Sequence, residues 1–178
     1  MELNSELRSK IKAIDFLILD VDGVLTDGKI IIDDHGNETK QFHVRDGHGI
    51  KLLQRAGVEV MLLTGRISGV VTHRARELGI EEVYQGAKNK VEVLETILQK
   101  RAISGNTIAY VGDDVVDIPV FNRVGFAAAV ADAAELAKEA ADYLTEHRGG
   151  DGAVREVCEL IIAVKGKWDD VMARYEVI

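Results

Sequence analysis

Residues 17–27 read L-I-L-D-V-D-G-V-L-T-D, and the fold can be predicted outward from this stretch. The apolar, β-prone residues before Asp20 predict a buried strand. Asp20 and Asp22 follow that strand two positions apart, and Gly23 comes directly after them. Open α/β sheets bind their ligands at the carboxyl ends of the strands, so we expect these two carboxylates to carry the chemistry of the protein.

The rest of the chain alternates between strand-like and helix-like patterns. We expect strands at 58–63, 83–84, 107–111, 127–130 and 143–144, and helices at 48–56, 68–78, 89–100, a segment ending at 121, 133–140 and 153–164. Asp46 is expected to cap the helix at 48–56. This alternation predicts a parallel sheet with right-handed crossovers. Because no repeat or linker divides the 178 residues, we expect one doubly wound, Rossmann-like α/β domain over 1–178.

An insertion at about 28–44 has the pattern of a β-hairpin. Ile30, Ile31 and Ile32 form one predicted arm, D-D-H-G-N the turn, and E-T-K-Q-F-H-V the other arm. An exposed hairpin should alternate apolar and polar residues, whereas three consecutive isoleucines indicate that both faces are covered. The cover is either the core of the same chain or another subunit.

Composition limits the classes of function. A net charge of −8 argues against nucleic acid as a partner, because binding to phosphate backbones needs clustered Lys and Arg. The apolar runs are too short for a membrane span, and the N-terminus lacks the pattern of a signal peptide. The single cysteine, Cys158, forms no internal disulfide. We therefore expect a soluble cytoplasmic protein that acts on a small molecule.

Polar residues follow two further predicted strands, Thr64 after one and Asp113, Asp114 and Asp117 after the other. In a parallel sheet these ends meet Asp20 in one crevice. Clustered carboxylates repel one another unless a cation lies among them, and oxygen-only ligands favour Mg²⁺. The alternative for Asp114 and Asp117 is that each merely caps the helix that follows.

A metal ion beside two carboxylates suggests phosphoryl chemistry, in which one Asp attacks phosphorus and its neighbour transfers protons. The phosphate oxygens then need donors and positive charge. Thr64 can donate its hydroxyl, and Lys90 at a helix start can supply an ammonium group. Lys88 is the alternative for that role, and either lysine could instead be a solvated surface residue.

D-V-D-G-V-L-T at 20–26, Thr64, Lys90 and G-D-D-V-V-D at 112–117 occur in the order of four motifs of the haloacid dehalogenase superfamily of phosphatases, which this chain resembles. The resemblance implies that Asp20 is the nucleophile and Asp22 the general acid and base. It also implies further roles: Asp20, the Asp22 carbonyl and Asp113 bind Mg²⁺, Asp114 and Asp117 support the metal, and Thr64 and Lys90 hold the phosphoryl group.

Longer motifs resemble one subfamily, the 3-deoxy-D-manno-octulosonate 8-phosphate phosphatases of lipopolysaccharide precursor synthesis. They are D-G-K-I-I (27–31), F-H-V-R-D-G-H-G-I (42–50), L-T-G-R (63–66), Y-Q-G (84–86) and G-G-D-G-A-V-R-E-V-C-E-L-I (149–161). Phosphatases of nine-carbon, sialic-type sugar 9-phosphates are related and remain an alternative. The resemblance implies a homotetramer assembled through the hairpin. The 41 residues between Asp22 and Thr64 and the 22 between Lys90 and Asp113 leave no room for a cap domain.

An ulosonate substrate carries a carboxylate besides its phosphate, so a cation should meet it. Arg66, beside Gly65, is the best candidate, and Arg45, His73 and Arg148 are alternatives. Gly149 and Gly150 lie near the start of the C-terminal tail (about 146–178), where they form either a lid over the substrate or an ordinary loop.

Two other classes of protein compete with the phosphatase interpretation. A phosphorylatable receiver-like switch domain also combines clustered acids, a Thr and a Lys in an α/β sheet. Its acids are adjacent, however, and its phosphoacceptor lies on a later strand, whereas here Asp20 and Asp22 end the first strand. The second competitor is a catalytically dead structural or binding domain, and the presence of every motif residue argues against it.

Overall fold

The computed structural model describes residues 3–176. Within that range the main sheet has six parallel strands in the order β5-β4-β1-β6-β7-β8. Their bounds are β1 Phe16–Leu19, β4 Glu59–Leu63, β5 Glu82–Tyr84, β6 Ile108–Gly112, β7 Phe126–Ala129 and β8 Tyr143–Leu144. The chain passes outward from β1 to β4 and β5, then returns to β6 on the other side of β1. The point where this direction reverses is the usual ligand-binding crevice of such sheets.

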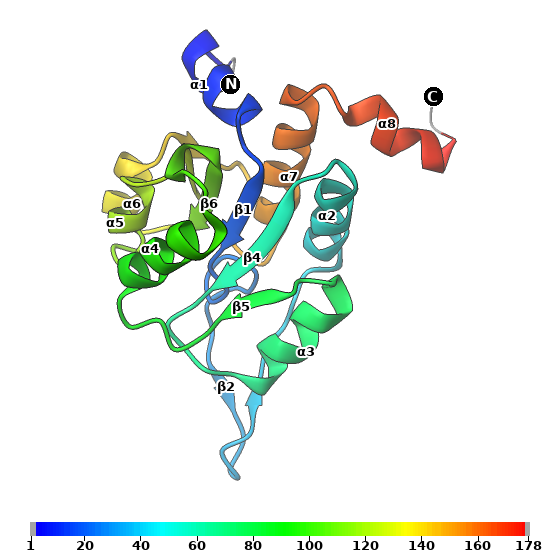
Figure 1. Cartoon of the computed structure of the whole chain (residues 1–178). Helices are drawn as coiled ribbons and strands as arrows, with labels where there is room; N and C mark the ends of the chain where they lie inside the picture. Colours follow the sequence, from blue (N-terminus) through cyan, green and yellow to red (C-terminus); the bar gives the residue numbers. More distant parts are fainter. Residues whose placement is uncertain (1–2, 177–178) are drawn as a thin grey trace.

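Helices cover both faces of the sheet, as expected for a doubly wound domain (Figure 1). One layer contains α2 (Val44–Arg55), α3 (Gly69–Leu78) and α7 (Ala153–Val164), and the other contains α4 (Lys90–Arg101), α5 (Ile118–Phe121) and α6 (Glu135–Ala140). Because helices cover the sheet on both sides, β6 and β7 are buried along their whole length, which explains their uninterrupted apolar sequences.

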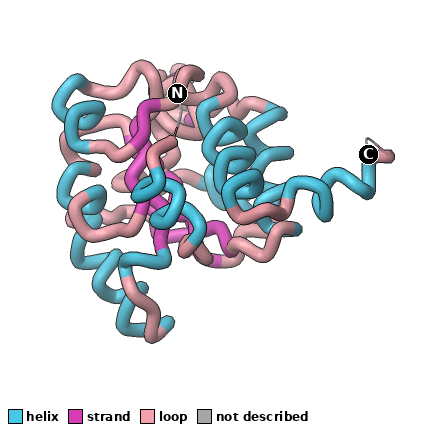
Figure 2. Tube along the Cα trace, turned by 90° about the horizontal axis from the view of Figure 1, so that it is seen from above, coloured by secondary structure: helices cyan, strands magenta, loops and turns pink. Residues whose placement is uncertain are grey.

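Smaller elements flank this core. Helix α1 (Ser5–Lys12) precedes β1 near the start of the chain, and a 3₁₀ turn (Gly105–Thr107) precedes β6 in its middle. After α7, the chain forms α8 (Trp168–Met172) and a 3₁₀ turn (Ala173–Tyr175), where the sequence suggested only a charged tail. This segment extends away from the body of the molecule (Figure 2). Between residues 3 and 176, no helix is both long and apolar enough to cross a membrane.

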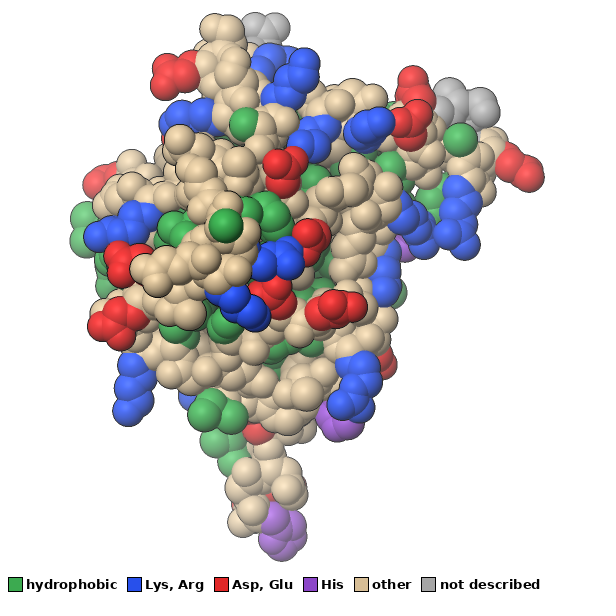
Figure 3. Space-filling model, viewed as in Figure 1, with side chains coloured by type: hydrophobic (Ala, Val, Ile, Leu, Met, Phe, Trp, Pro, Cys, Tyr) green, Lys and Arg blue, Asp and Glu red, His purple; other side chains and the backbone are tan. Residues whose placement is uncertain are grey.

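The hairpin lies outside the main sheet as β2 (Ile31–Ile32) paired antiparallel with β3 (Glu38–Thr39) (Figure 1). Its second arm is shorter than predicted, because the strand ends at Thr39 and α2 already begins at Val44. Ile30, Ile31 and Ile32 are 56%, 41% and 57% exposed. The core therefore does not cover them, and hydrophobic side chains are visible along the hairpin in Figure 3.

The prediction that Asp46 caps the helix after it is wrong. The N-cap of α2 is His43, and Asp46 lies inside the first turn. Its buried carboxylate instead accepts hydrogen bonds from the backbone N–H groups of Gly152 (3.3 Å) and Arg155 (2.8 Å) at the start of α7. This contact depends on the close packing of α2 against α7, where a Cβ on Gly49 would lie 2.9 Å from the Cα of Arg155.

Candidate active site

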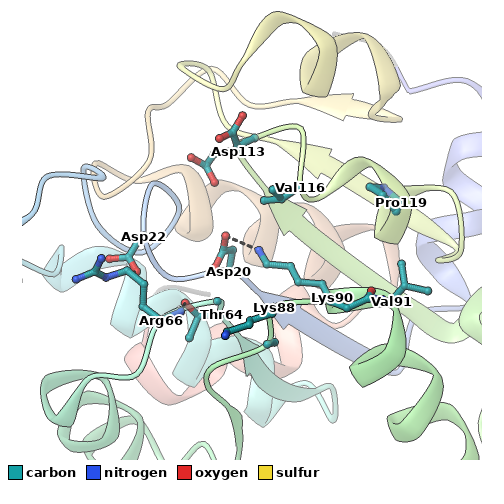
Figure 4. A pocket seen from close by; sticks show the side chains of 14 residues that line it. Asp20, Asp22, Thr64, Arg66, Lys88, Lys90, Val91, Asp113, Val116 and Pro119 are labelled. Carbon is teal, nitrogen blue, oxygen red and sulfur yellow. Dashed lines mark hydrogen bonds and ion pairs between the residues drawn. The ribbon is translucent and has the colours of Figure 1, made fainter.

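A cavity of about 600 Å³ opens at the carboxyl ends of β1, β4 and β6. Its walls bring together the five residues predicted to do the chemistry, which are Asp20, Asp22, Thr64, Lys90 and Asp113 (Figure 4). They meet there because β1 is hydrogen-bonded to both β4 and β6, with Leu19 opposite Leu62 on one side and Val111 on the other. The three strands therefore end side by side, and the residues that follow them lie close together although they are far apart in the sequence.

Asp20 and Lys90 form a buried ion pair at the floor of the cavity. Lys90 Nζ lies 2.7 Å from Asp20 Oδ2, and Asp20 Oδ1 accepts a hydrogen bond from the N–H of Val21 at 2.7 Å. Asn89 caps α4 through the N–H groups of Val91 and Glu92, which places Lys90 at the first position of the helix. Lys88 also lines the cavity but is exposed. The geometry therefore favours Lys90 over Lys88 as the partner of Asp20.

Asp117 is fully buried and organises the loop after β6. Its Oδ1 accepts hydrogen bonds from Lys90 Nζ (2.6 Å) and Tyr110 Oη (2.7 Å). Its Oδ2 accepts from the backbone N–H groups of Asp113 (3.0 Å) and Asp114 (3.2 Å). The alternative that the Asp117 side chain caps α5 is wrong, since it makes no such bond. Asp114 lines the cavity, and its carboxylate accepts from the N–H of Val115.

Two glycines allow the acidic side chains to approach the backbone. A Cβ on Gly23, whose φ is +88°, would overlap the carboxylate of Asp113. A Cβ on Gly112 would lie 2.6 Å from the Cβ of Asp117. The glycine after the two acids of β1 is thus needed for contact with the loop that follows β6.

The acidic cluster of Asp20, Asp113 and Asp117 carries more negative charge than Lys90 can balance. Burial raises the pKa of Asp20 to about 6; Lys90 opposes this shift and the charge of Asp117 adds to it. Burial, together with the charges of Asp20 and Asp117, raises the pKa of Asp113 to about 7. Carboxylate oxygens of Asp20, Asp113 and Asp117 lie within 4.8 Å of one another. An all-oxygen site with excess negative charge fits a hard divalent cation.

Asp22 lies apart from this cluster, on the side of the hairpin. Its Oδ1 accepts a hydrogen bond from Lys40, a buried residue just after β3. Lys40 was not predicted as a site residue. The only local signal is that Glu38 and Lys40, two positions apart, share one face of the hairpin arm. That signal does not reveal that their face meets Asp22.

The structure separates the predicted substrate contacts into two groups. Gly65 and Arg66 line the cavity, and Thr64 beside them is buried, its Oγ1 accepting from the N–H of Arg66 at 3.4 Å. Arg45 lines a different hollow, between α2 and α7, and Arg148 pairs with Asp132 at 3.2 Å. His73 is exposed and is not among the residues that line the cavity.

Gly149 and Gly150 pack against the turn that follows Asp22. The N–H of Gly150 donates to the carbonyl of Val24 at 2.8 Å, and Gly149 donates to Asp132 at 2.9 Å. In this arrangement the two glycines support the turn at 23–26, and they are not among the residues that line the cavity.

Comparison with known proteins gives matches over nearly the whole chain. A family model of haloacid dehalogenase-like hydrolases matches residues 75–157. The 3-deoxy-D-manno-octulosonate 8-phosphate phosphatase of Escherichia coli K12 is 46% identical over 168 residues, which cover 94% of this chain and 89% of that protein.

Solved structures show the same similarity. The Moraxella catarrhalis 3-deoxy-D-manno-octulosonate 8-phosphate phosphatase, solved with a magnesium ion, a phosphate ion and a KDO molecule, is 39% identical with a TM-score of 0.94, covering 97% of this chain and 99% of that one. A probable YrbI family phosphatase from Pseudomonas syringae pv. phaseolica is 41% identical with a TM-score of 0.94, covering 97% and 98% of the two chains.

A doubly wound sheet without a cap domain in residues 3–176, with acidic residues after β1 and β6, Thr64 after β4 and Lys90 at the start of α4, defines a haloacid dehalogenase-like hydrolase. The sequence identity to the phosphatases above, and the share of each chain that is aligned, show which family of this class the chain belongs to. The chain belongs to the 3-deoxy-D-manno-octulosonate 8-phosphate phosphatase family.

Proposed function

We propose that this protein is a Mg²⁺-dependent phosphatase that hydrolyses 3-deoxy-D-manno-octulosonate 8-phosphate to the free sugar acid and phosphate. The observation that carries the proposal is the placement of Asp20 in one cavity with Lys90, Thr64 and Asp113. Family membership at 46% identity and the relative solved with magnesium, phosphate and KDO support this choice of substrate.

In the proposed reaction, a carboxylate oxygen of Asp20 attacks phosphorus and the bond from phosphorus to the sugar oxygen breaks. Asp22 gives its proton to the leaving oxygen, which releases the sugar acid and leaves an aspartyl-phosphate on Asp20. Asp22 then takes a proton from a water molecule that attacks the same phosphorus. The products are inorganic phosphate and the original carboxylate of Asp20. Lys90 and Thr64 hold the phosphoryl oxygens throughout.

The residues that would hold the cation are Asp20, Asp113 and the backbone carbonyl of Asp22, with Asp114 and Asp117 in support. When bound, Mg²⁺ neutralises charge on the phosphoryl oxygens and so favours attack by an anionic nucleophile. Both carboxylate oxygens of Asp117 accept hydrogen bonds from protein donors. In this structure Asp117 therefore positions the loop that carries Asp113.

The sugar end of the substrate would extend out of the open cavity toward Arg66, whose guanidinium can meet the ulosonate carboxylate. Further walls would come from neighbouring subunits in a homotetramer built through the hairpin. The setting we propose is the cytoplasm, where the product would enter lipopolysaccharide precursor synthesis. Gly65 would line the path of the sugar beside Arg66.

The experiment that tests this function compares phosphate release from three substrate classes in the presence of Mg²⁺. These are 3-deoxy-D-manno-octulosonate 8-phosphate, nine-carbon ulosonate 9-phosphates and hexose phosphates. We expect a clear preference for the eight-carbon substrate, and loss of activity with EDTA or in Asp20→Asn. A preference for nine-carbon or hexose phosphates would overturn the substrate assignment. Release of no phosphate from any ester would overturn the phosphatase itself.

A further inference from the structure

The side chain of Lys40 is buried although it lies on a hairpin outside the main sheet. It is 1% exposed, its ammonium donates to Asp22 Oδ1, and it lies 3.3 Å from Glu38 Oε1. A buried ammonium group is costly unless it is paired with carboxylates. The two carboxylates therefore hold Lys40 in place, and Lys40 in turn holds Asp22.

Arg66 completes a network of four charges. Its Nη2 donates to Glu38 Oε1 at 3.0 Å, and its Nε lies 3.9 Å from Asp22 Oδ2. Two members of the network, Glu38 and Lys40, belong to the hairpin, whereas Asp22 and Arg66 follow strands of the main sheet. The network is formally neutral and connects the hairpin to the edge of the cavity.

The two oxygens of Asp22 have different surroundings. Lys40 donates to Oδ1, whereas Oδ2 is buried, lies 3.9 Å from Arg66 Nε and has no hydrogen-bond partner among residues 3–176. A protonated carboxyl group has one O–H donor, and an oxygen that already accepts a hydrogen bond from an ammonium group is less basic than one that accepts none. The contact with Lys40 thus leaves Oδ2 as the oxygen that can carry the proton.

We infer that Lys40 is a positioning residue for proton transfer by Asp22, holding Oδ1 so that Oδ2 is the oxygen that gives its proton to the leaving oxygen. The inference rests on the proposed function, because it takes Asp22 to be the general acid. The proton moves from Asp22 Oδ2 to the ester oxygen as the bond from phosphorus to oxygen breaks. Lys40 keeps all of its protons and does not touch the substrate.

The test uses two phosphate esters that differ in how much they need a proton on the leaving oxygen. A primary alkyl phosphate such as the eight-carbon ulosonate 8-phosphate needs one, whereas 4-nitrophenyl phosphate releases a stabilised anion. Lys40→Met should lower kcat/KM for the alkyl ester about 10- to 100-fold and for the nitrophenyl ester less than about 3-fold. Equal losses for both esters, or no loss for either, would overturn the inference.

The ratio of the two kcat/KM values does not depend on the fraction of folded enzyme, because both are measured on one preparation. Partial unfolding of Lys40→Met therefore cannot imitate the expected result. Lys29→Met is the matched control, since Lys29 lies on the same hairpin but is exposed and pairs with Asp27 at 2.7 Å. Its ratio should equal that of the wild type. Lys40→Arg keeps the positive charge and should restore most of the ratio.

Coupling to Asp22 supplies a second check. Introduced into Asp22→Asn, Lys40→Met should change kcat/KM for the alkyl ester by less than about 2-fold, because the group that it positions is already lost. A further tenfold loss in the double variant would overturn the inference. If the proposed substrate is wrong, the wild type will show no preference for the eight-carbon ulosonate 8-phosphate. The ratio of kcat/KM for the alkyl and nitrophenyl esters is then measured with the best primary alkyl phosphate that the wild type hydrolyses.

Discussion

Asp20 and Asp22 are two positions apart in the sequence, and the structure gives them different partners. Asp20 pairs with Lys90 from α4 among the buried acids, whereas Asp22 pairs with Lys40 from the hairpin at the edge of the cavity. In the proposed reaction the first carboxylate attacks phosphorus and binds the metal, and the second transfers protons. The two positions should therefore fail in different ways when they are mutated.

Asp20→Asn should lower turnover by at least about 10³-fold, since an amide cannot replace the nucleophile. It should also give no phosphoenzyme. Asp22→Asn should still form the aspartyl-phosphate from 4-nitrophenyl phosphate, and the adduct should accumulate because water is no longer activated. Intact-protein mass spectrometry after rapid quenching measures the adduct. An adduct in Asp20→Asn, or its absence in Asp22→Asn, would contradict the division of roles.

The raised pKa of Asp113, about 7, predicts how the metal-free protein responds to pH. In the unfolded chain an Asp ionises near pH 4, so the native state holds its proton more tightly than the unfolded state. The stabilising contribution of protonated Asp113 is present at low pH and is lost as pH rises toward 7. With EDTA, the melting temperature of the wild type should therefore fall relative to Asp113→Asn between pH 5 and pH 8. A difference that is constant with pH would contradict the prediction.

At the scale of elements, the turn after β1 and the loop after β6 contact each other through Gly23. Gly23→Ala should displace Asp113 and weaken apparent Mg²⁺ affinity by about 10-fold or more, measured from the Mg²⁺ dependence of activity. Gly36→Ala is the matched control. Gly36 has a similar φ of +81°, yet an added Cβ meets nothing within 4 Å. Backbone strain is thus common to both variants, and equal Mg²⁺ affinities would exclude the proposed clash.

The cap of α7 by Asp46 is an interaction between elements more than a hundred residues apart. Asp46→Ala removes the acceptor of two backbone N–H groups and should cost about 1–2 kcal/mol of unfolding free energy. Urea denaturation measures this loss. Asp151→Ala, an exposed carboxylate next to the same helix start, should change the free energy by less than about 0.5 kcal/mol. Similar losses in both variants would argue against the cap.

The main sheet and the five principal site residues could be predicted from the sequence because their signals are local. The central strands β1, β4, β6 and β7 are largely apolar runs. The rule that parallel strands end at one edge then brings Asp20, Thr64 and Asp113 together. Lys40 and Asp46 could not be predicted in this way. Their partners are set by how the hairpin meets the sheet and how α2 packs on α7, and neither contact leaves a local pattern.

At the scale of the whole molecule, the exposed isoleucines of the hairpin remain without a partner in the single chain, within residues 3–176. The predicted homotetramer would bury them. Replacing Ile30, Ile31 and Ile32 with Ser should reduce the mass measured by light scattering and leave the circular dichroism spectrum unchanged, because these side chains are outside the core. A wild type that is already monomeric, or a variant with unchanged mass, would contradict assembly through the hairpin.

The contact between the acids after β1 and β6 has a consequence for folding. Asp20 and Asp113 are 93 positions apart, so their carboxylates meet only after β6 has docked beside β1. Closing so long a loop is slow, and an unfolded chain offers no equivalent cluster. A cation held by both acids therefore binds the native state alone and stabilises it by mass action. The cellular concentration of that cation would then change the free energy of unfolding, as well as how fast the protein turns over substrate.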